Sequence, residues 1–284
     1  MIKPSDLNEI KIILHYTRLT EIEIISNKYE SKLSPIEINN IEKAINQYRK
    51  GLPLDYIFNK IKFLDQDFII SFDTLIPREE TEEWVQRLIT KFQKQEQIYQ
   101  TQTLVDLATG SGVIGISLTK FFKQVYLSDI SPKALEITKQ NVSISLHNTP
   151  DQNSKQKLII LESNLLQNYP KNLEIDVLTA NLPYLPSSDK ANAISNNISY
   201  EPPIALYSGQ DGLDLFKELI SQIQQKQQAK HNQSNHQSIK EIYLELDPRN
   251  IKNAIVIAQT KLPEYNWEIW TDYNKFERVL VGIC

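Results

Sequence analysis

The chain has 284 residues, a formal net charge of -4 and a hydrophobic content of 40%. This length predicts one large domain or two unequal domains, and the hydrophobic content is sufficient for a packed core. The acidic balance argues against a protein that binds nucleic acid by covering its phosphates with positive charge. The one cysteine, Cys284, permits no intrachain disulfide, and with four scattered histidines it forms no pattern typical of a zinc site, so we expect no metal.

The N-terminus lacks the basic and then apolar pattern of a secretory signal. No apolar run approaches the roughly 18 residues that a helix needs to span a bilayer. We therefore expect a cytoplasmic protein that does not contact a membrane.

The first fifty residues carry apolar side chains at helical spacing in three successive runs. The third run opens with Ser34-Pro35-Ile36-Glu37, which fits a capping box with proline at the first helical position, and it ends before Gly51. The pattern predicts a small helical bundle as a separate domain over residues 1–53.

Residues 54–76 are predicted to form a linking β-hairpin. The β-favouring stretches Ile57-Phe58 and Phe68-Ile69-Ile70 lie on either side of a polar Asp65-Gln66-Asp67 turn. The hairpin would join the bundle to the larger domain that follows.

Residues 77–284 alternate short apolar strands with helical stretches, which is typical of a mostly parallel sheet covered by helices. The predicted strands are Leu104–Leu107, Val125–Ser128, Leu158–Leu161, Asp176–Ala180, Ile242–Leu246, Trp267–Thr271 and Arg278–Val281. The connection between the last two is too short for a helical crossover, so they should pair antiparallel. The fold class is therefore α/β, with one doubly wound, Rossmann-like domain. The polar stretches 148–156 and 226–238 are predicted to be flexible surface loops.

Three of the seven glycines, Gly110, Gly112 and Gly115, lie within six residues. They follow the strand that ends at Leu107 and precede a helical stretch over Val113–Phe122. They therefore occupy a strand-to-helix turn at which the backbone can approach a ligand closely. The turn also matches Gly-x-Gly-x-x-Gly, so a dinucleotide is an alternative ligand.

Two aspartates flank this turn in the predicted sheet. Asp129 ends the next strand, where a carboxylate can accept hydrogen bonds from both hydroxyls of a ribose. Asp106 precedes the turn and can face the ammonium group of an amino-acid tail through the loop backbone. Each has a local alternative, because Asp129 can cap the helix that opens at Ser131-Pro132 and Asp106 can cap the turn.

The tetrapeptide Asn181-Leu182-Pro183-Tyr184 ends a short apolar strand about seventy residues after the glycine turn. Methyl transfer to a planar nitrogen needs hydrogen-bond acceptors that localise its lone pair. The side-chain carbonyl of Asn181 and the backbone carbonyl of Leu182 supply two, because Pro183 favours an extended Leu182. Tyr184 offers a flat face. The dinucleotide alternative leaves this tetrapeptide unexplained, although it can also be a simple strand-ending turn.

Over nearly its full length the chain resembles the protein-(glutamine-N5) methyltransferases that modify class 1 peptide chain release factors. The stretches that carry the resemblance are Leu75–Glu82, Asp106–Gly112, Asp129–Leu135, Tyr200–Leu206 and Gly209–Leu213. The last two are the more discriminating, because many methyltransferases share the glycine loop.

The resemblance implies a class I methyltransferase fold, S-adenosylmethionine as cofactor, and methyl transfer to the glutamine of a Gly-Gly-Gln tripeptide in a release factor. The residues that it places at the cofactor are Asp106, Ala108, Thr109, Gly110, Ser111, Gly112, Asp129, Asn164, Leu165 and Asn181. The catalytic residues that receive the glutamine would be Asn181, Leu182, Pro183 and Tyr184. The helical bundle would help dock the protein substrate, and the enzyme is expected to be a monomer that makes no direct contact with nucleic acid.

Five positions depart from the pattern of that family. Ala108 replaces a glycine, which would weaken cofactor binding if the backbone there needs a positive φ. Leu182 replaces a commoner proline, and Glu79 replaces another. Asn164 stands where an aspartate is more frequent, and Leu165 where an aromatic residue is sometimes found. None of these changes removes a group that the reaction requires.

Three alternatives stay open. An adenine-N6 methyltransferase acting on RNA or DNA uses a similar tetrapeptide, because the exocyclic amine poses the same lone-pair problem. The glutamine can belong to another protein, such as a ribosomal one. A non-catalytic binding protein with a cofactor-type fold would be expected to lose the glycine loop or Asn181, and both are present.

Overall fold

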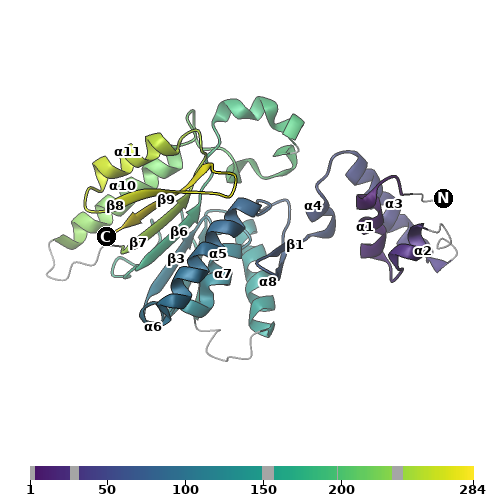
Figure 1. Ribbon diagram of the computed structural model, residues 1–284, viewed down its shortest axis with the longest axis horizontal. Coiled ribbons are helices and arrows are strands. Elements are labelled where there is room, and N and C mark those ends of the chain that lie inside the picture. Colours follow the sequence, from purple (N-terminus) through teal and green to yellow (C-terminus); the bar gives the residue numbers. More distant parts are fainter. Residues whose placement is uncertain (1–3, 26–31, 149–156, 197, 232–238) are drawn as a thin grey trace.

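The computed structural model describes residues 4–25, 32–148, 157–196, 198–231 and 239–284. The N-terminal helices lie at one end of an elongated molecule, and the large sheet with its helices forms the other end (Figure 1). The helices of the N-terminal part are α1 (Leu7–Tyr16), α2 (Glu21–Ile25), α3 (Pro35–Arg49) and α4 (Leu54–Phe58).

Capping and one ion pair set the geometry of the N-terminal helices. The predicted capping box at α3 is confirmed: the Ser34 side chain accepts from the Glu37 backbone N–H, and the Glu37 side chain accepts from the Ser34 backbone N–H. Helix α1 is joined to α3 by Glu9, which is fully buried, and Arg49, with Oε1 and Nε 2.6 Å apart. The helices pack as a bundle, and its buried residues, such as Ile12 and Ile41, belong to an apolar cluster that continues into the larger domain.

The hairpin is present, but its first strand starts later than predicted. Strands β1 (Lys60–Phe63) and β2 (Gln66–Ile69) pair antiparallel. The turn is at Leu64 and Asp65, whose φ angles of 48° and 61° suit the two-residue turn that matches strand twist. The prediction that Ile57-Phe58 forms a strand is wrong, because those residues complete α4, which ends at a left-handed Asn59.

Within the described residues, seven strands form one sheet in the order β5-β4-β3-β6-β7-β9-β8. They are β3 (Thr103–Leu107), β4 (Gln124–Asp129), β5 (Leu158–Glu162), β6 (Val177–Asn181), β7 (Glu241–Glu245), β8 (Asn266–Thr271) and β9 (Glu277–Ile283). All pairs are parallel except those of β9, which runs antiparallel to both β7 and β8. All seven strands predicted for this sheet, and the antiparallel final pair, are confirmed within two residues at each end.

The order of the strands places a crevice between β3 and β6. The chain winds outward from β3 to β5 and then returns to β6 beside β3, so the direction of winding reverses between these two strands. In doubly wound sheets, ligands bind at the carboxyl ends of the strands at such a reversal. Both the glycine turn and the Asn181 tetrapeptide follow these two strands.

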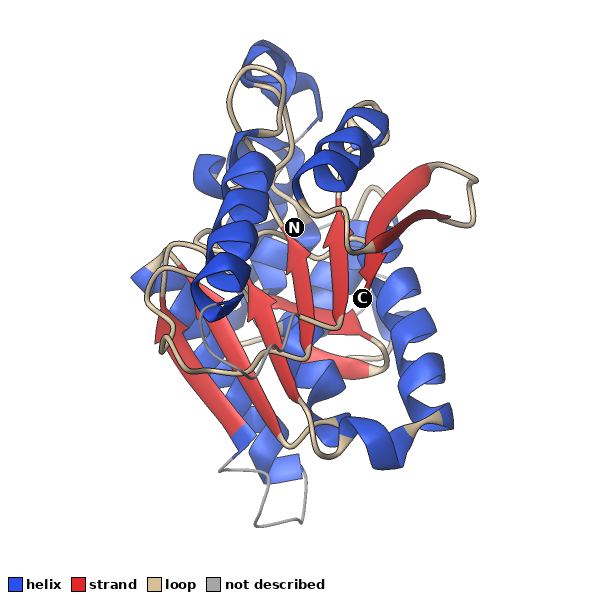
Figure 2. Ribbon diagram, turned by 90° about the vertical axis from the view of Figure 1, so that its left-hand side faces the viewer, coloured by secondary structure: helices blue, strands red, loops and turns tan. Residues whose placement is uncertain are grey.

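Helices cover both faces of the sheet (Figure 2). They are α5 (Glu79–Lys94), α6 (Glu96–Tyr99), α7 (Val113–Leu118), α8 (Pro132–Asn148), α10 (Asp214–His231) and α11 (Ile251–Lys261). Successive residues of a strand point to opposite faces, so Leu104 packs in the core under α5 and α7, and Val105 in the core under α10 and α11. Short 3-10 helices, η2 (Thr119–Phe121), η3 (Ser187–Asn196), η4 (Ile198–Tyr200) and η5 (Pro203–Ala205), occupy the connections.

One of the two predicted loops is partly wrong. Residues 226–231 belong to α10, because lysine, glutamine and alanine favour a helix even without an apolar period. The remainder of that loop, 232–238, lies outside the described residues. In the other predicted loop, residues 149–156 also lie outside the described residues, and Asn148 is the last residue of α8.

Candidate active site

The carboxylate of Asp106 holds the glycine turn between β3 and α7. It accepts hydrogen bonds from the Thr109 hydroxyl at 2.6 Å, the Gly115 backbone N–H at 3.1 Å and the Thr179 hydroxyl at 2.9 Å. Full burial raises the pKa of Asp106 to about 6, although these three donors favour its ionised form. Asp106 therefore fixes the conformation of the turn through hydrogen bonds to residues on both sides of it.

Three residues of this turn have left-handed backbone conformations. Their φ angles are 50° at Ala108, 57° at Gly110 and 85° at Gly112. Glycine adopts this region freely, but the β-carbon of alanine meets the following carbonyl there at a cost of roughly 1 kcal/mol. The positive φ that would make Ala108 an unfavourable replacement is thus present in the structure.

Asp129, at the end of β4, faces the glycine turn. Its Oδ2 accepts from the Gly110 backbone N–H at 3.0 Å, and its Oδ1 accepts from the Ser131 backbone N–H at 2.9 Å. Burial raises the pKa of Asp129, and the backbone donors oppose that rise. Asp129 therefore accepts from the backbone at the start of α8 and also lines the cavity, so its two predicted roles are compatible.

A cavity lies at the carboxyl ends of β3, β4, β5 and β6. The predicted site residues that line it are Ala108, Thr109, Gly110, Ser111, Asp129, Asn164, Leu165, Asn181, Leu182 and Pro183. Its remaining walls come mainly from segment 73–81 before and within α5, and from Ile204 and Ala205 of η5. Asp106, Gly112 and Tyr184 are not among the residues that line it. The predicted roles of all these residues at cofactor and substrate stay predictions.

Asn164 and Leu165 follow β5 in a tight turn. The Ser163 hydroxyl donates to the Leu165 carbonyl at 2.7 Å, and Leu165 has a φ of 51°. The Leu165 side chain is buried and lines the cavity, so an apolar surface stands where the related family sometimes has an aromatic ring. Asn164 presents an amide at the same wall.

The tetrapeptide that begins at Asn181 leaves β6 and runs along the cavity. The Asn181 Nδ2 donates to the Thr81 hydroxyl at 3.2 Å. Beyond the tetrapeptide, Leu185 exchanges backbone hydrogen bonds with Leu206 and Ser208, at 2.8 and 2.9 Å. The tetrapeptide is therefore fixed at both ends.

Glu245, for which no role was predicted, lies beside Asn181 at the end of the neighbouring strand β7. It is 1% exposed, and its Oε2 accepts from the Thr81 hydroxyl at 2.7 Å and from the Trp84 indole N–H at 2.8 Å. Burial raises the pKa of Glu245, whereas the two donors and the positive charge of Arg278 lower it.

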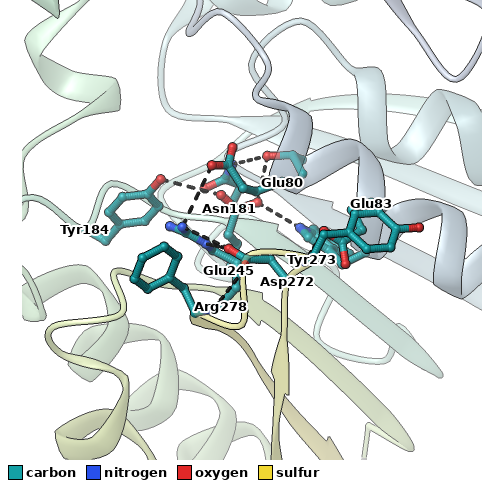
Figure 3. A network of polar contacts seen from close by, with 11 residues as sticks. Glu80, Glu83, Asn181, Tyr184, Glu245, Asp272, Tyr273 and Arg278 are labelled. Atoms are coloured by element: carbon teal, nitrogen blue, oxygen red, sulfur yellow. Dashed lines mark hydrogen bonds and ion pairs between the residues drawn. The ribbon is translucent and has the colours of Figure 1, made fainter. Parts of the chain in front are cut away.

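Figure 3 shows Glu245 at the centre of a polar network near the cavity. Arg278 contacts Asp272 at 3.2 Å and Glu80 at 3.9 Å, and the Tyr184 hydroxyl lies 3.5 Å from Glu245 Oε1. The burial of Tyr184 raises the pKa of its hydroxyl, so it is neutral at physiological pH.

Two signals in the sequence pointed to these unpredicted residues. Thr81 belongs to Leu75–Glu82, one of the stretches that carry the family resemblance. Glu245 interrupts the apolar strand Ile242–Leu246, and a carboxylate in a buried strand requires specific donors. The sequence does not reveal that the two residues meet.

Among the described residues, no group of three or more histidine, cysteine, aspartate or glutamate side chains is placed to hold a metal ion. No helix in the described part of the chain has the length and apolar character to cross a membrane.

Comparison with known proteins extends these observations. The family described as Methyltransferase small domain matches residues 81–211. A release factor glutamine methyltransferase from Leptospira interrogans is 33% identical over 222 residues, which cover 77% of this chain and 74% of that protein. One from Mycoplasma mycoides is 31% identical over 264 residues, which cover 91% and 85%.

The fold is also found in solved structures of low sequence identity. The hMettl16 catalytic domain, in complex with MAT2A 3'UTR hairpin 6, has a TM-score of 0.55 and 10% identity over 88% of this chain and 82% of that one. This likeness concerns the fold alone. Sequence identity over most of both chains, together with the cavity at the strand ends, shows that this chain belongs to the family of release factor glutamine methyltransferases.

Proposed function

We propose that this protein transfers a methyl group from S-adenosylmethionine to the side-chain amide nitrogen of the glutamine in the Gly-Gly-Gln tripeptide of a class 1 peptide chain release factor. Family membership supports the reaction, the cofactor and the kind of substrate. The observation that carries the proposal is that Asn181 and Leu182 line the same cavity as the glycine turn and Asp129.

The side chains around the cavity fit this cofactor. The Asp129 carboxylate accepts one backbone N–H on each oxygen and keeps lone pairs for the two hydroxyls of a ribose. Asn164 offers an amide to the exocyclic amine of adenine, and Leu165 offers an apolar surface to its ring. When bound, S-adenosylmethionine supplies a methyl group on a positively charged sulfur, which makes that methyl an electrophile.

Asn181 and Leu182 would prepare the substrate nitrogen. An amide nitrogen shares its lone pair with its carbonyl group and is therefore a poor nucleophile. We assign the two acceptors for its N–H groups to Asn181 Oδ1 and the Leu182 backbone carbonyl, because both residues line the cavity. Binding both N–H groups fixes the plane of the amide and localises the lone pair on the nitrogen.

Positioning would supply most of the catalysis. Holding two reactants in a near-attack geometry lowers the activation free energy by roughly 7–11 kcal/mol. No general base is required, since the methylated nitrogen is acidic and loses its proton to water. The protein's task is to orient the amide and to hold it in the cavity.

The N-terminal helices would serve the protein substrate. We propose that the bundle over residues 1–53 helps dock the release factor, with the hairpin over 54–76 connecting it to the methyltransferase domain over 77–284. We also propose that the enzyme acts as a cytoplasmic monomer without direct contact to nucleic acid. Size measurement in solution and the release factor's affinity for a chain lacking α1 to α3 test these assignments.

Mass spectrometry tests the proposed reaction. A recombinant class 1 release factor is incubated with the protein and S-adenosylmethionine, and an Asn181→Ala variant serves as the control. We expect a gain of one methyl group on the Gly-Gly-Gln glutamine with the native chain only. If no methyl is gained while the cofactor binds normally, the release factor is not the substrate, and ribosomal proteins and RNA become the next substances to assay.

A further inference from the structure

A directed chain of hydrogen bonds ends at Asn181. The Trp84 indole N–H and the Thr81 hydroxyl both lie within 2.8 Å of Glu245 Oε2. The Thr81 hydroxyl also lies 3.2 Å from Asn181 Nδ2. Trp84 and Thr81 are buried with exposed fractions of 4% and 1%, so water does not compete freely for these contacts.

The chemistry of the groups fixes the direction of this chain. An indole N–H can only donate, so the atom of Glu245 that contacts Trp84 must accept. The Thr81 hydroxyl has one proton, and it donates that proton to the same carboxylate oxygen. Because this proton is used, the Thr81 oxygen can offer Asn181 lone pairs only. It must therefore accept a hydrogen bond from an N–H of Asn181.

The two ends of an asparagine amide have nearly the same shape, so their surroundings decide which end points where. Because Thr81 can only accept, the amide nitrogen of Asn181 is drawn toward Thr81. The carbonyl Oδ1 is left for the cavity that Asn181 lines. This is the orientation that an acceptor for a substrate N–H requires.

We propose that Thr81, held by Glu245 and Trp84, is a positioning residue that selects the catalytically competent orientation of the Asn181 amide. This inference rests on the proposed function of Asn181 as an acceptor. In the opposite orientation the cavity would present an NH2 group to the NH2 group of the substrate glutamine, and two donors would face one another.

The position of Thr81 explains why a threonine is used. It lies in the first turn of α5, whereas its partners end strands β6 and β7, so one hydroxyl links three elements. A valine of similar shape would pack there, but it would leave the Asn181 amide without a partner that distinguishes nitrogen from oxygen. The amide would then populate both orientations.

Three variants test the proposal through activity. Thr81→Val removes the hydroxyl, and we expect kcat/KM for the release factor to fall roughly tenfold or more, as for the loss of one buried hydrogen bond. Thr81→Ser keeps the hydroxyl and should restore kcat/KM to within about threefold of the native value. The matched control is Thr90→Val on the same helix, which removes an exposed hydroxyl that donates to the Gln86 carbonyl within α5.

Glu245→Gln tests the direction of the chain. Trp84 still requires an oxygen at the shared position, so the glutamine carbonyl should occupy it and Thr81 should still donate there. We expect kcat/KM of this variant to fall by less than about tenfold from the native value. It should stay above kcat/KM of Thr81→Val. Combining Thr81→Val with Asn181→Ala should add no further loss in single-turnover measurements, because Thr81 acts through Asn181.

A readout without substrate separates this inference from the proposed function. In NMR spectra of the full-length 15N-labelled protein, the Asn181 side-chain NH2 protons should show NOEs to the Thr81 methyl group, and Asn181→Ala assigns their signals. Cofactor affinity of the Thr81→Val, Thr81→Ser and Thr90→Val variants should match that of the native chain.

Absence of those NOEs, or a Thr81→Val variant as active as Thr90→Val, would overturn the positioning role even if the release factor is methylated. Conversely, NOEs in a protein that methylates no release factor would support the orientation and refute only the proposed substrate.

Discussion

Arg78 and Glu201, 123 positions apart in the sequence, form an ion pair with Nη2 and Oε2 2.6 Å apart. The Glu201 side chain is 2% exposed and the Arg78 side chain 35%. Arg78 immediately precedes α5, and Glu201 immediately follows η4. The pair therefore joins two segments that supply walls of the cavity from opposite parts of the chain.

Removing Arg78 should destabilise the protein. In Arg78→Met the buried Glu201 carboxylate loses its cation, and we expect the free energy of unfolding to fall by about 1–3 kcal/mol, less than for a fully buried pair because Arg78 is partly exposed. The double variant Arg78→Met with Glu201→Gln should recover part of the loss. Urea unfolding followed by tryptophan fluorescence measures both.

Lys139→Met is the matched control, since it breaks an exposed pair with Glu136 on α8 and should change stability by under about 0.5 kcal/mol. An Arg78→Met variant as stable as this control would show that the ion pair does not hold the two segments together.

Ala108→Gly should strengthen the glycine turn. Removing the β-carbon at a φ of 50° relieves the left-handed strain, partly offset by the larger entropy of an unfolded glycine, for a net gain of about 0.5 kcal/mol. Cofactor affinity, measured by calorimetry, should rise or stay equal. Ala254→Gly, in the middle of α11, should instead lose about 1 kcal/mol. Equal losses in both variants would contradict the strain at position 108.

Asp129→Ala should chiefly weaken cofactor binding. Under the proposed assignment the lost carboxylate would accept from two ribose hydroxyls, so the dissociation constant of S-adenosylmethionine should rise roughly tenfold to a hundredfold. Asp67→Ala provides the control with unchanged affinity, because Asp67 is exposed on β2, does not line this cavity and pairs with Lys60 at 2.8 Å. Titration calorimetry that finds equal affinity for native and Asp129→Ala proteins would reject the ribose contact.

The stability of the protein should depend on the ionisation of Asp106. Its pKa rises from 3.8 to about 6 on folding because it is fully buried. A raised pKa means that the folded state holds the proton more tightly, so the contribution of Asp106 to stability is present below pH 3.8 and is lost as pH rises through 6.

Asp106→Asn removes this titration, so the variant serves as the reference against which the native chain is compared. The free energy of unfolding of the native chain minus that of the variant should fall by roughly 2–3 kcal/mol between pH 4 and pH 7. Denaturant titrations at four or five pH values measure the difference. A difference that is independent of pH would mean that Asp106 has the same pKa in the folded and unfolded states.

Local patterns in the sequence were sufficient for the elements that surround the site. Strand β6 shows this, because an apolar run that ends at Asn181 fixes both the strand and the residue at its carboxyl end. The capping box at Ser34 is equally local. Local patterns failed at Ile57-Phe58, where β-favouring residues complete a one-turn helix instead. Short apolar runs suit either structure, and packing decides between them.

The tertiary structure alone decided which side chains meet. Thr81 and Glu245 are 164 positions apart, and their contact depends on how α5 packs against the ends of β6 and β7. From the sequence, Asn181 was predicted to lie at the end of a strand and to act through its side-chain amide. The sequence did not determine which end of that amide faces the cavity, because the direction of a hydrogen-bond chain depends on donors and acceptors brought together only by folding.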